Sequence, residues 1–456
     1  MRNIHIFTPK LNKCYLHFIH ENQDLNKLII CEALAHIDSI FLHSKIYNKQ
    51  MSEAHKPLKD IKVLDLTHML SGPYGGMILA DLGCEVVKVE PLIKGEGTRR
   101  LLENDPDYSV NGMGAYFYTL NRNKKSLSLD LKKSEGIKIF YELVKKADVV
   151  LSNFSAGVTK KLKIDFDHLK DINPKIITCT VSGFGESGPN FQRPAFDQIA
   201  QALGGGMSIT GLSASEPIRA GIPIGDLGGG MFAVMGIQAA LIARVQSGVG
   251  QHVDISMLDC QVSMLNYMAT MHTMSGIVPY PIGNSHFVHM PYNTFATKDY
   301  PIVIAAVGDQ FWPRLLKIFK TPELADSKYD EAFERQKDKE KLEKILQNEL
   351  IHQSSEHWLA ELEKESVPCA RVNNLEQALN DEQVQFRNML VDVPHPEGGS
   401  AKIPGNPIKL SSVENEEFLA PPLLGAHTKE VLTNWLGYSS EELESLNEQQ
   451  IIEMHK

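Results

Sequence analysis

Cysteine is scarce in this chain of 456 residues, with six in all and no CxxC pair. Single, scattered cysteines exclude a disulfide framework and a zinc site of the usual spacing. They are typical of a reducing compartment, so we expect a cytoplasmic protein without bound metal, with the mitochondrial matrix as the alternative. The cysteines are Cys14, Cys31, Cys84, Cys179, Cys260 and Cys369.

Positive charge is also in short supply. The chain has 46 Lys and Arg against 56 Asp and Glu, which leaves a formal charge of −10. Binding to a nucleic-acid backbone requires clustered cations that displace counterions. The balance therefore excludes a broad nucleic-acid surface, and we expect no nucleic-acid partner.

A long uninterrupted apolar run is missing near the N-terminus. The stretch over residues 28–43 is broken by Glu32, His36 and Asp38. A bilayer span needs roughly 20 apolar residues, and a signal peptide would begin earlier. We expect no membrane partner. Residues 1–56 are interpreted as an extension upstream of the folded part, with Met51 as the functional start, although the acid-free first twenty residues are a weak sign of a mitochondrial presequence.

The remaining composition is that of an ordinary globular protein, with 43% hydrophobic and 22% charged residues. Short apolar runs that predict buried strands alternate with stretches of helical periodicity, such as residues 134–146. This alternation is the signature of a parallel sheet with crossover helices, so we predict a doubly wound, Rossmann-like α/β fold. The predicted strands are IKVLDLT, EVVKVE, SLSLDL, ADVVLSNF and KIITCTVSGF.

A long helix is predicted over residues 226–247, apolar nearly all round and therefore buried between layers. A strand, QHVDIS, and a methionine-rich helix follow, and the spacing of these methionines predicts that they fill the core. Residues 276–292 read as a loop, after which YPIVIAAVG and charged helices begin a second unit. We predict a large domain from residues 57–274 and 386–456 and a small α+β domain from residues 275–385.

Three glycine clusters, at residues 71–76, 204–206 and 224–230, are the first chemical clue, because glycine lets a ligand or a second backbone approach closely. Residues 71–76, SGPYGG, lie between a predicted strand and helix, where a helix N-terminus could hold phosphate or a tight turn could form. Residues 224–230 read IGDLGGG and place Asp226 at a helix start. This aspartate could be an N-cap. Alternatively, its carboxylate stands uncovered among free backbone N–H groups, as nucleophilic acyl chemistry requires.

An ordered series of motifs decides between these alternatives. From about Leu58 to the end the chain resembles the class III CoA-transferases, the CaiB/BaiF family that includes formyl-CoA transferase and succinyl-CoA:glutarate CoA-transferase. The matching stretches are LKDIKVLDLTHMLSGP, LGCEVVKVEP with GEGTRR, LNRNKKSLSLDL, ADVVLSNFSAG, RPAFDQIAQALGG, GIPIGDLGGG, GVGQHVDISMLD, MPYNTFATKD and APPLLGAHTKEVL.

The resemblance implies that Asp226 is the nucleophile. It would attack an acyl-CoA thioester to give a mixed anhydride, and CoA would return to form an aspartyl-CoA thioester before the acceptor acid reverses the sequence. Acyl-CoA and small carboxylic acids, above all short dicarboxylates, are then the substrates, and no permanently bound cofactor is expected. The family further implies an interlocked homodimer.

Positions that match CoA-contacting motifs of the family carry a second set of predictions, each with a plain alternative. A histidine at this place could be an ordinary core residue, and exposed lysines are usually only solvated. The predicted CoA-binding residues are His68, Ser71, Lys124, Lys125, Asn153, Phe154 and Lys161.

The chain also departs from the formyl-CoA transferase pattern. Leu70 stands for a Gln and Pro91 for an Arg, which puts oxalate and formate specificity in doubt. Phe196 and Asp197 replace a Tyr-Glu pair, so Asp197 is predicted to keep an acidic role near the substrate. Arg219 is predicted to meet the distal carboxylate of a diacid, with a surface ion pair as the alternative.

Three rival functions remain. An acyl-CoA racemase of the same superfamily needs an acid and a base on opposite faces of the substrate, and the family's histidine is replaced here by Phe196. A nicotinamide-dependent dehydrogenase would need a GxGxxG after a strand, and none is present. A non-catalytic CoA-binding protein would not need the GD loop at Asp226.

Overall fold

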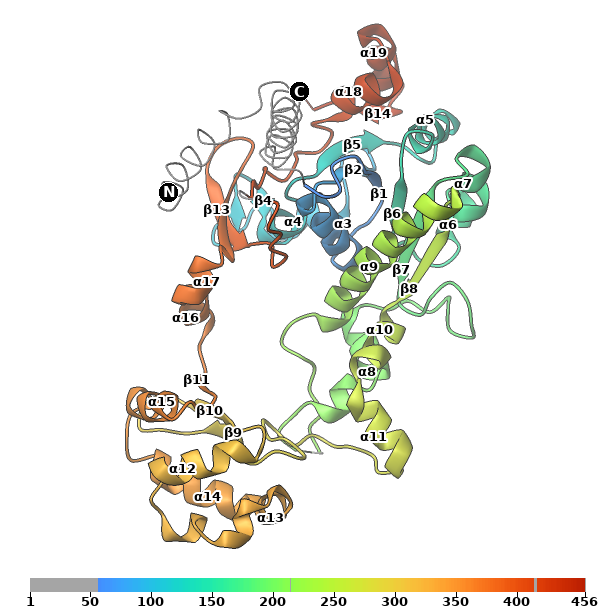
Figure 1. Ribbon diagram of the computed structural model, residues 1–456. Helices are drawn as coiled ribbons and strands as arrows, with labels where there is room; N and C mark the ends of the chain where they lie inside the picture. Colours follow the sequence, from blue (N-terminus) through green and yellow to red (C-terminus); the bar gives the residue numbers. More distant parts are fainter. Residues whose placement is uncertain (1–55, 214, 414–415, 456) are drawn as a thin grey trace, which may run out of the picture. The chain divides into compact units, whose positions relative to one another are not determined.

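The computed structural model describes residues 56–213, 215–413 and 416–455, and its centre is a seven-stranded sheet of order β14-β5-β2-β1-β6-β7-β8 (Figure 1). All neighbours pair in parallel except β14, which is antiparallel to β5. The prediction of a mostly parallel sheet is thus confirmed. The strands are β1 (Lys62–Asp65), β2 (Glu85–Glu90), β5 (Lys125–Leu129), β6 (Val149–Ser152), β7 (Ile177–Ser182), β8 (His252–Ser256) and β14 (Ile452–Glu453).

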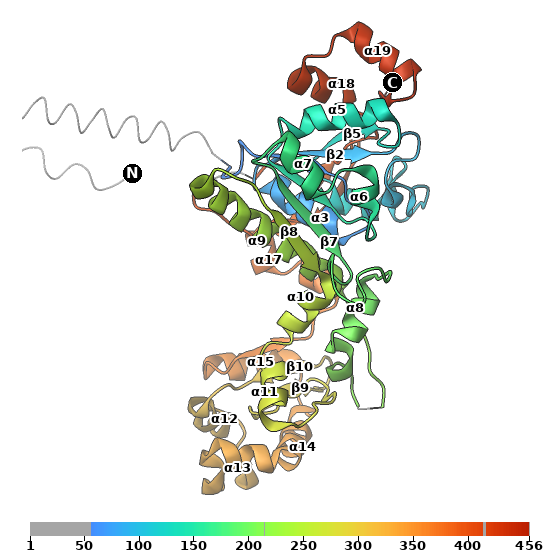
Figure 2. The ribbon, with the colours of Figure 1, turned by 90° about the vertical axis from the view of Figure 1, so that its right-hand side faces the viewer.

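Both faces of the sheet are covered by helices, which explains why its strands are apolar at successive positions. Val63 packs into a core with α3 and α9, whereas its neighbour Leu64 packs into a second core with α5 and α7 on the opposite face. Figure 2 shows α9 and α5 separated by the strands. The helices are α3 (Ser71–Asp81), α5 (Ser134–Val144), α7 (Phe166–Ile172) and α9 (Ile224–Ser247).

The strand order contains one reversal of direction, and this locates the site. From β1 the chain adds β2 and β5 on one side, and from β6 it adds β7 and β8 on the other side. In open parallel sheets, ligands bind in the crevice outside the carboxyl ends of the strands at such a switch point. The loops that follow β1 and β6 are therefore the first place to look for a cavity.

The glycine-rich segment at residues 71–76 is not the turn that was one of our two expectations. It forms the first half of α3. Its glycines serve the close packing of α3 against β1 and α9 and not a turn. A Cβ on Gly76 would lie 2.7 Å from Asp65 Oδ2, and one on Gly75 would lie 3.1 Å from the carbonyl oxygen of Gly230 on α9. Helices α3 and α9 thus cross with their backbones almost in contact.

We expect Gly230→Ala to destabilise this crossing. The added Cβ would lie 2.6 Å from the Ser71 carbonyl oxygen and 3.2 Å from Gly75 N, and backbone atoms cannot move aside without shifting α3. Overpacking of this kind typically costs ~1–3 kcal/mol, so the melting temperature should fall. Gly221→Ala is the control, because a Cβ there meets no atom within 4 Å. Equal melting temperatures for both variants would contradict the packing argument.

Helix α9 is buried on one side only, which corrects the expectation of burial all round. Ala233 and Ile237 are fully buried, but Met235, Ile242 and Val245 are 52%, 66% and 86% exposed. By length and composition α9 could cross a membrane, yet its inner face belongs to the core beside β7. An apolar face remains open on this helix.

The methionine-rich segment forms α10 (Met257–Met264) and α11 (Tyr267–Ser275). Met257 is buried as predicted, but Met271 and Met274 are 41% and 83% exposed, so the core-filling interpretation is wrong for α11. Helical spacing places these side chains on one face, and no part of the described chain covers that face completely.

A separate core is formed by buried residues between Met290 and Val367, and β9, β10 and β11 form an antiparallel sheet beside it. Its charged helices match the expectation for this region, while the exact division into large and small domains stays a prediction. The strands are β9 (Tyr292–Phe295), β10 (Ile302–Ala305) and β11 (Cys369–Arg371), and the helices are α12 (Trp312–Ile318), α13 (Ala332–Lys337), α14 (Lys339–Leu350) and α15 (Ser355–Lys364).

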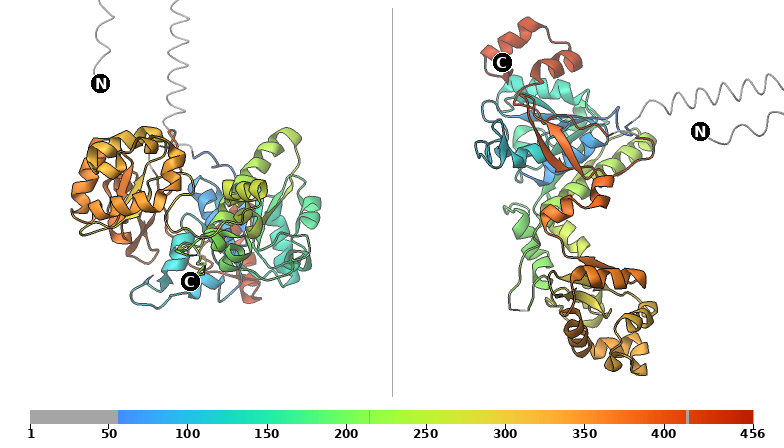
Figure 3. Two further views of the ribbon diagram at one scale, coloured as in Figure 1. Left: turned by 90° about the horizontal axis from the view of Figure 1, so that it is seen from below. Right: turned by 90° about the vertical axis from the view of Figure 1, so that its left-hand side faces the viewer.

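The remaining elements include the antiparallel hairpin of β12 and β13, which the right-hand view of Figure 3 shows in orange. The expectations for residues 1–55 lie outside the described residues. The elements are β3 (Ser109–Val110), β4 (Met113–Gly114), α4 (Ala115–Leu120), α6 (Val158–Leu162), α8 (Asp197–Leu203), α16 (Leu375–Leu379), α17 (Glu382–Phe386), β12 (Leu390–Pro394), β13 (Ser400–Pro404), α18 (Thr428–Val431) and α19 (Ser440–Glu448).

Candidate active site

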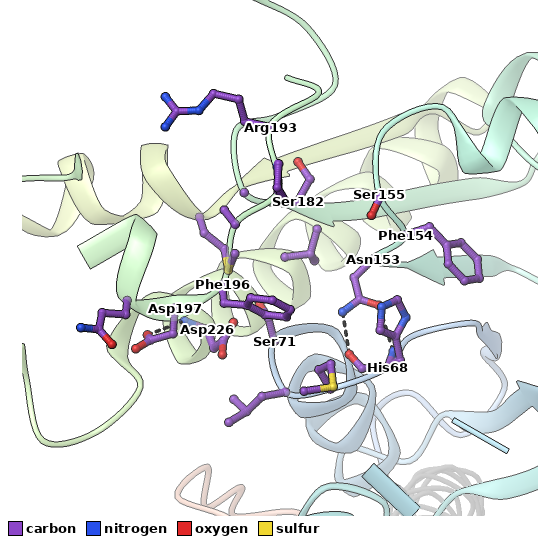
Figure 4. Close-up of a pocket in the computed structure, with 18 of the residues that line it drawn as sticks. His68, Ser71, Asn153, Phe154, Ser155, Ser182, Arg193, Phe196, Asp197 and Asp226 are labelled. Carbon is purple, nitrogen blue, oxygen red and sulfur yellow. Dashed lines mark hydrogen bonds between the residues drawn. The ribbon is translucent and has the colours of Figure 1, made fainter. Parts of the chain in front are cut away.

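A cavity of about 490 Å³ lies at the carboxyl ends of β1 and β6, at the switch point of the sheet (Figure 4). Residues 68–71 after β1 and 153–156 after β6 form one part of its wall, and residues 191–198 with the start of α9 form another. Seven of the predicted site residues line it together. They are His68, Ser71, Asn153, Phe154, Asp197, Arg219 and Asp226.

The three predicted lysines do not line this cavity. Lys124 is fully buried, and its Nζ pairs with Asp65 Oδ2 at 2.9 Å while also donating to Pro73 O and Asn121 Oδ1. Burial lowers the pKa of Lys124 to about 8. All three donors of the ammonium are engaged, so the expectation that Lys124 faces a phosphate does not fit this geometry.

Lys125 and Lys161 lie elsewhere on the surface. Lys125 forms ion pairs with Glu85 and Glu430 at 2.7 and 2.8 Å. Lys161 is exposed on α6 and outside the cavity wall. Lys161 corresponds to the solvated-lysine alternative, whereas Lys125 is held by its two ion pairs, and we leave both out of the candidate site.

His68 and Asn153 connect the ends of β1 and β6. The Asn153 side chain accepts a hydrogen bond from His68 N at 2.9 Å and donates one to His68 O at 2.7 Å. The His68 ring lies 5.7 Å from that of Phe154, and burial lowers its pKa. A neutral imidazole in the wall of a cavity suits hydrogen bonding to a ligand, and the alternative of a core histidine does not fit.

Asp226 is the third residue of α9, and its carboxylate has no hydrogen-bond partner among the described residues. The N-cap residue of α9 is Pro223, which makes no side-chain hydrogen bond to the helix. Asp226 is therefore not the cap of its own helix. Burial and then the charge of Asp197 raise the pKa of Asp226 to about 6. The arrangement is that of a partly desolvated and unpaired carboxylate facing a cavity, which is a plausible nucleophile.

Asp197 caps α9 from a distance, and this corrects the expectation of free N–H groups beside Asp226. Its Oδ1 accepts hydrogen bonds from Gly225 N at 2.8 Å and Asp226 N at 3.3 Å. Its Oδ2 accepts one from Gln201 Nε2, and Gln201 in turn accepts one from Ala220 N. Asp197 therefore positions the start of α9 and adds negative charge next to Asp226.

We expect Asp197→Asn to shift the pH dependence of the reaction downward. If Asp226 is the nucleophile, it must be ionised to react, so kcat/KM should fall about tenfold per pH unit below its pKa of about 6. Removing the Asp197 charge lowers that pKa, whereas the Asn oxygen still accepts from Gly225 N. The acidic limb of the profile should move to lower pH. Asp197→Ala, which also removes the cap, should lose activity at every pH, and an unmoved limb in the Asn variant would contradict the coupling.

Two residues that the sequence reasoning did not single out also line the cavity, Tyr116 and Arg193. Burial and the charges of Asp226 and Asp197 raise the pKa of the Tyr116 phenol, so it stays protonated as a donor. Helix α4 thus places a phenol in the wall of the cavity. Arg193 belongs to the RPAFDQ motif itself, whereas nothing in the sequence links Tyr116 to the GD loop before folding.

Comparison with known proteins gives one consistent result. The sequence profile of "CoA-transferase family III" matches residues 58–428. A succinyl-CoA:glutarate CoA-transferase of Mus musculus is 34% identical over 89% of this chain and 92% of its own length. An acetyl-CoA:oxalate CoA-transferase of Acetobacter aceti is 37% identical over 79% of this chain and 90% of its own. The crystal structure of a CaiB/BaiF family protein from Brucella suis, 33% identical, superposes with a TM-score of 0.73 over 83% of this chain and 99% of its own.

Proposed function

Because the chain belongs to CoA-transferase family III, we propose that it moves CoA from a short acyl-CoA to a small dicarboxylic acid through covalent intermediates on Asp226. The observation that carries the mechanism is the Asp226 carboxylate, which faces the cavity unpaired and with its pKa raised to about 6. At neutral pH most of it is ionised, and desolvation leaves it reactive.

The proposed reaction runs through two reversible exchanges. An Asp226 oxygen attacks the thioester carbon, the C–S bond breaks and CoA leaves as a thiolate, which yields a mixed anhydride. The thiolate then attacks the aspartyl carbon of that anhydride and expels the donor as its carboxylate. The acceptor carboxylate repeats both steps in reverse order. Splitting one difficult transfer into steps on a positioned carboxylate lowers each barrier.

The wall formed after β1 and β6 is proposed to hold the CoA tail. His68, Asn153 and Phe154 place an imidazole, an amide and an aromatic face at the switch point of the sheet. The Asn153 amide is occupied by the backbone of His68, so we assign it to shaping this wall. The His68 and Phe154 rings are then free to contact the pantetheine portion.

One arginine supports a dicarboxylate as the acceptor. Arg219 lines the cavity and forms no ion pair with any described carboxylate, whereas the Arg193 guanidinium lies over the Phe184 ring, 5.3 Å from its centroid. The Arg219 guanidinium donates only to the neighbouring Ala220 and Gly221 carbonyls. A second carboxylate on the substrate would complete such a site. The named relatives act on glutarate and oxalate, which are dicarboxylic acids.

We also propose an interlocked homodimer in a reducing compartment, the cytoplasm or the mitochondrial matrix. The open apolar surface of α9 and α11, with Val245 86% and Met274 83% exposed, is of a kind that a second copy would bury. Within the described residues the cysteines are free. Light scattering coupled to size exclusion should report twice the chain mass.

The function is tested by incubating the protein with succinyl-CoA and, separately, glutarate, oxalate or acetate, followed by chromatography of the CoA esters. We expect a new CoA ester with the dicarboxylates and much less with acetate. Exchange of α-protons in deuterated water without a new ester would instead favour a racemase. Hydrolysis of succinyl-CoA without any new CoA ester would refute the proposal that the protein transfers CoA to these acids.

A further inference from the structure

Ser71 is the first residue of α3 and has an unusual environment for a serine. The residue is 4% exposed, and its Oγ has no hydrogen-bond partner among the described residues. A buried hydroxyl without a partner is disfavoured by about 1–3 kcal/mol, so such groups are rare unless they have a role. Ser71 nevertheless belongs to the wall of the cavity (Figure 4).

The hydroxyl of Ser71 is directed at the face of α9 that carries Asp226. A Cβ on Gly229 would lie 2.5 Å from Ser71 Oγ. Gly229 follows Asp226 by three residues, and residues at this spacing are neighbours on one helix face. The absence of a side chain at Gly229 therefore leaves room for the hydroxyl on the face of α9 that carries Asp226.

The start of α3 adds to the electrostatic effect. Leu70 provides no side-chain cap and the first turn of this eleven-residue helix holds no acidic residue, although Glu96 Oε2 accepts a hydrogen bond from Met69 N at 3.4 Å just before the helix. By contrast, Asp197 occupies the N–H groups at the start of α9. The positive end of α3, together with the Tyr116 phenol in the cavity wall, is therefore what remains to stabilise a developing negative charge.

We propose that Ser71 donates a hydrogen bond to the carbonyl oxygen of Asp226 whenever that carboxyl group is acylated and attacked; this rests on the function proposed above. When the CoA thiolate attacks the aspartyl carbon of the anhydride, the C–S bond forms and the π electrons move to the Asp226 oxygen. The oxyanion collapses as the bond to the donor carboxylate breaks. Ser71 keeps its proton throughout and stabilises the oxyanion in both directions of the reaction. This role is additional to the contact with CoA that the sequence predicts for Ser71.

The test follows the half-reaction with succinyl-CoA and no acceptor, using rapid quenching and intact-protein mass spectrometry to detect CoA bound to the full chain. Loss of one oxyanion donor slows such steps by about 10²-fold, so we expect that decrease in Ser71→Ala, in kcat rather than in the KM for acyl-CoA. Ser71→Cys, which keeps the volume but has a weak donor, should be similarly slow.

Ser134→Ala is the matched control, since Ser134 is also the first residue of an eleven-residue helix that follows a strand but is exposed and outside this cavity. It should react like the unaltered protein. Ser71→Ala should melt no lower than the unaltered protein, because it removes a buried hydroxyl that has no partner. Normal rates in Ser71→Ala, or restoration by Cys, would overturn the inference while leaving the transferase intact. Failure of the unaltered protein to form the adduct would refute the proposed mechanism itself.

Discussion

Replacing Asp226 with Asn is expected to abolish CoA transfer, with kcat reduced by on the order of 10⁴-fold or more, as for other covalent nucleophiles. The amide is nearly isosteric but cannot form the anhydride or the aspartyl thioester. Transfer from succinyl-CoA to glutarate and the protein-bound CoA adduct should both disappear. A variant that still transfers CoA at the normal rate would show that Asp226 is not the nucleophile.

The same variant should be more stable than the unaltered protein at neutral pH. The pKa of Asp226 is raised from 3.8 to about 6, chiefly by burial, so its ionised form is disfavoured in the folded state. This penalty is absent below the unfolded pKa and grows as pH rises toward the folded pKa. After allowance for solvent screening, we expect Asn to gain about 1–2 kcal/mol at pH 7. Thermal unfolding at pH 7 and pH 4 checks this, because the gain should vanish at pH 4.

The second large effect is expected from Lys124→Met. Burial alone would raise the pKa of Asp65, but the charges of Lys124 and Lys88 outweigh it and hold that pKa below its ordinary value. Removing Lys124 leaves a carboxylate at 0% exposure without its direct partner, which typically costs about 3–5 kcal/mol. Denaturant unfolding should show a loss of this size.

The adjacent lysine provides the control. Lys125 pairs with Glu85 and Glu430, and its side chain is 30% exposed, so Lys125→Met should cost less than about 1 kcal/mol. Replacing both partners in Asp65→Asn with Lys124→Met should recover part of the loss, because neither member of this pair is left as a charge without the other. A single Lys124 variant as stable as the Lys125 variant would show that the buried pair does not hold the end of β1.

The candidate site was partly visible in the sequence, and the two neighbouring lysines show the limit. Adjacent residues of an extended segment point to opposite sides, so either Lys124 or Lys125 was expected to face inward. Which one, and whether a ligand or Asp65 would meet it, depends on α3 and β1, which lie some sixty residues earlier. The methionines of α11 pose the same problem, since spacing defines a face but not what covers it.

By itself the sequence determined the alternation of buried strands and helices, and hence the mostly parallel sheet, because burial on both faces demands apolar residues at successive positions. Through its motifs it also determined the family, and it predicted Asp226 as the nucleophile. Only the tertiary structure decided that Asp197 caps α9, that Gly229 admits Ser71 and that Lys124 is buried. These contacts join residues far apart in the chain, and their geometry exists only once α3 and α9 are packed together on the sheet.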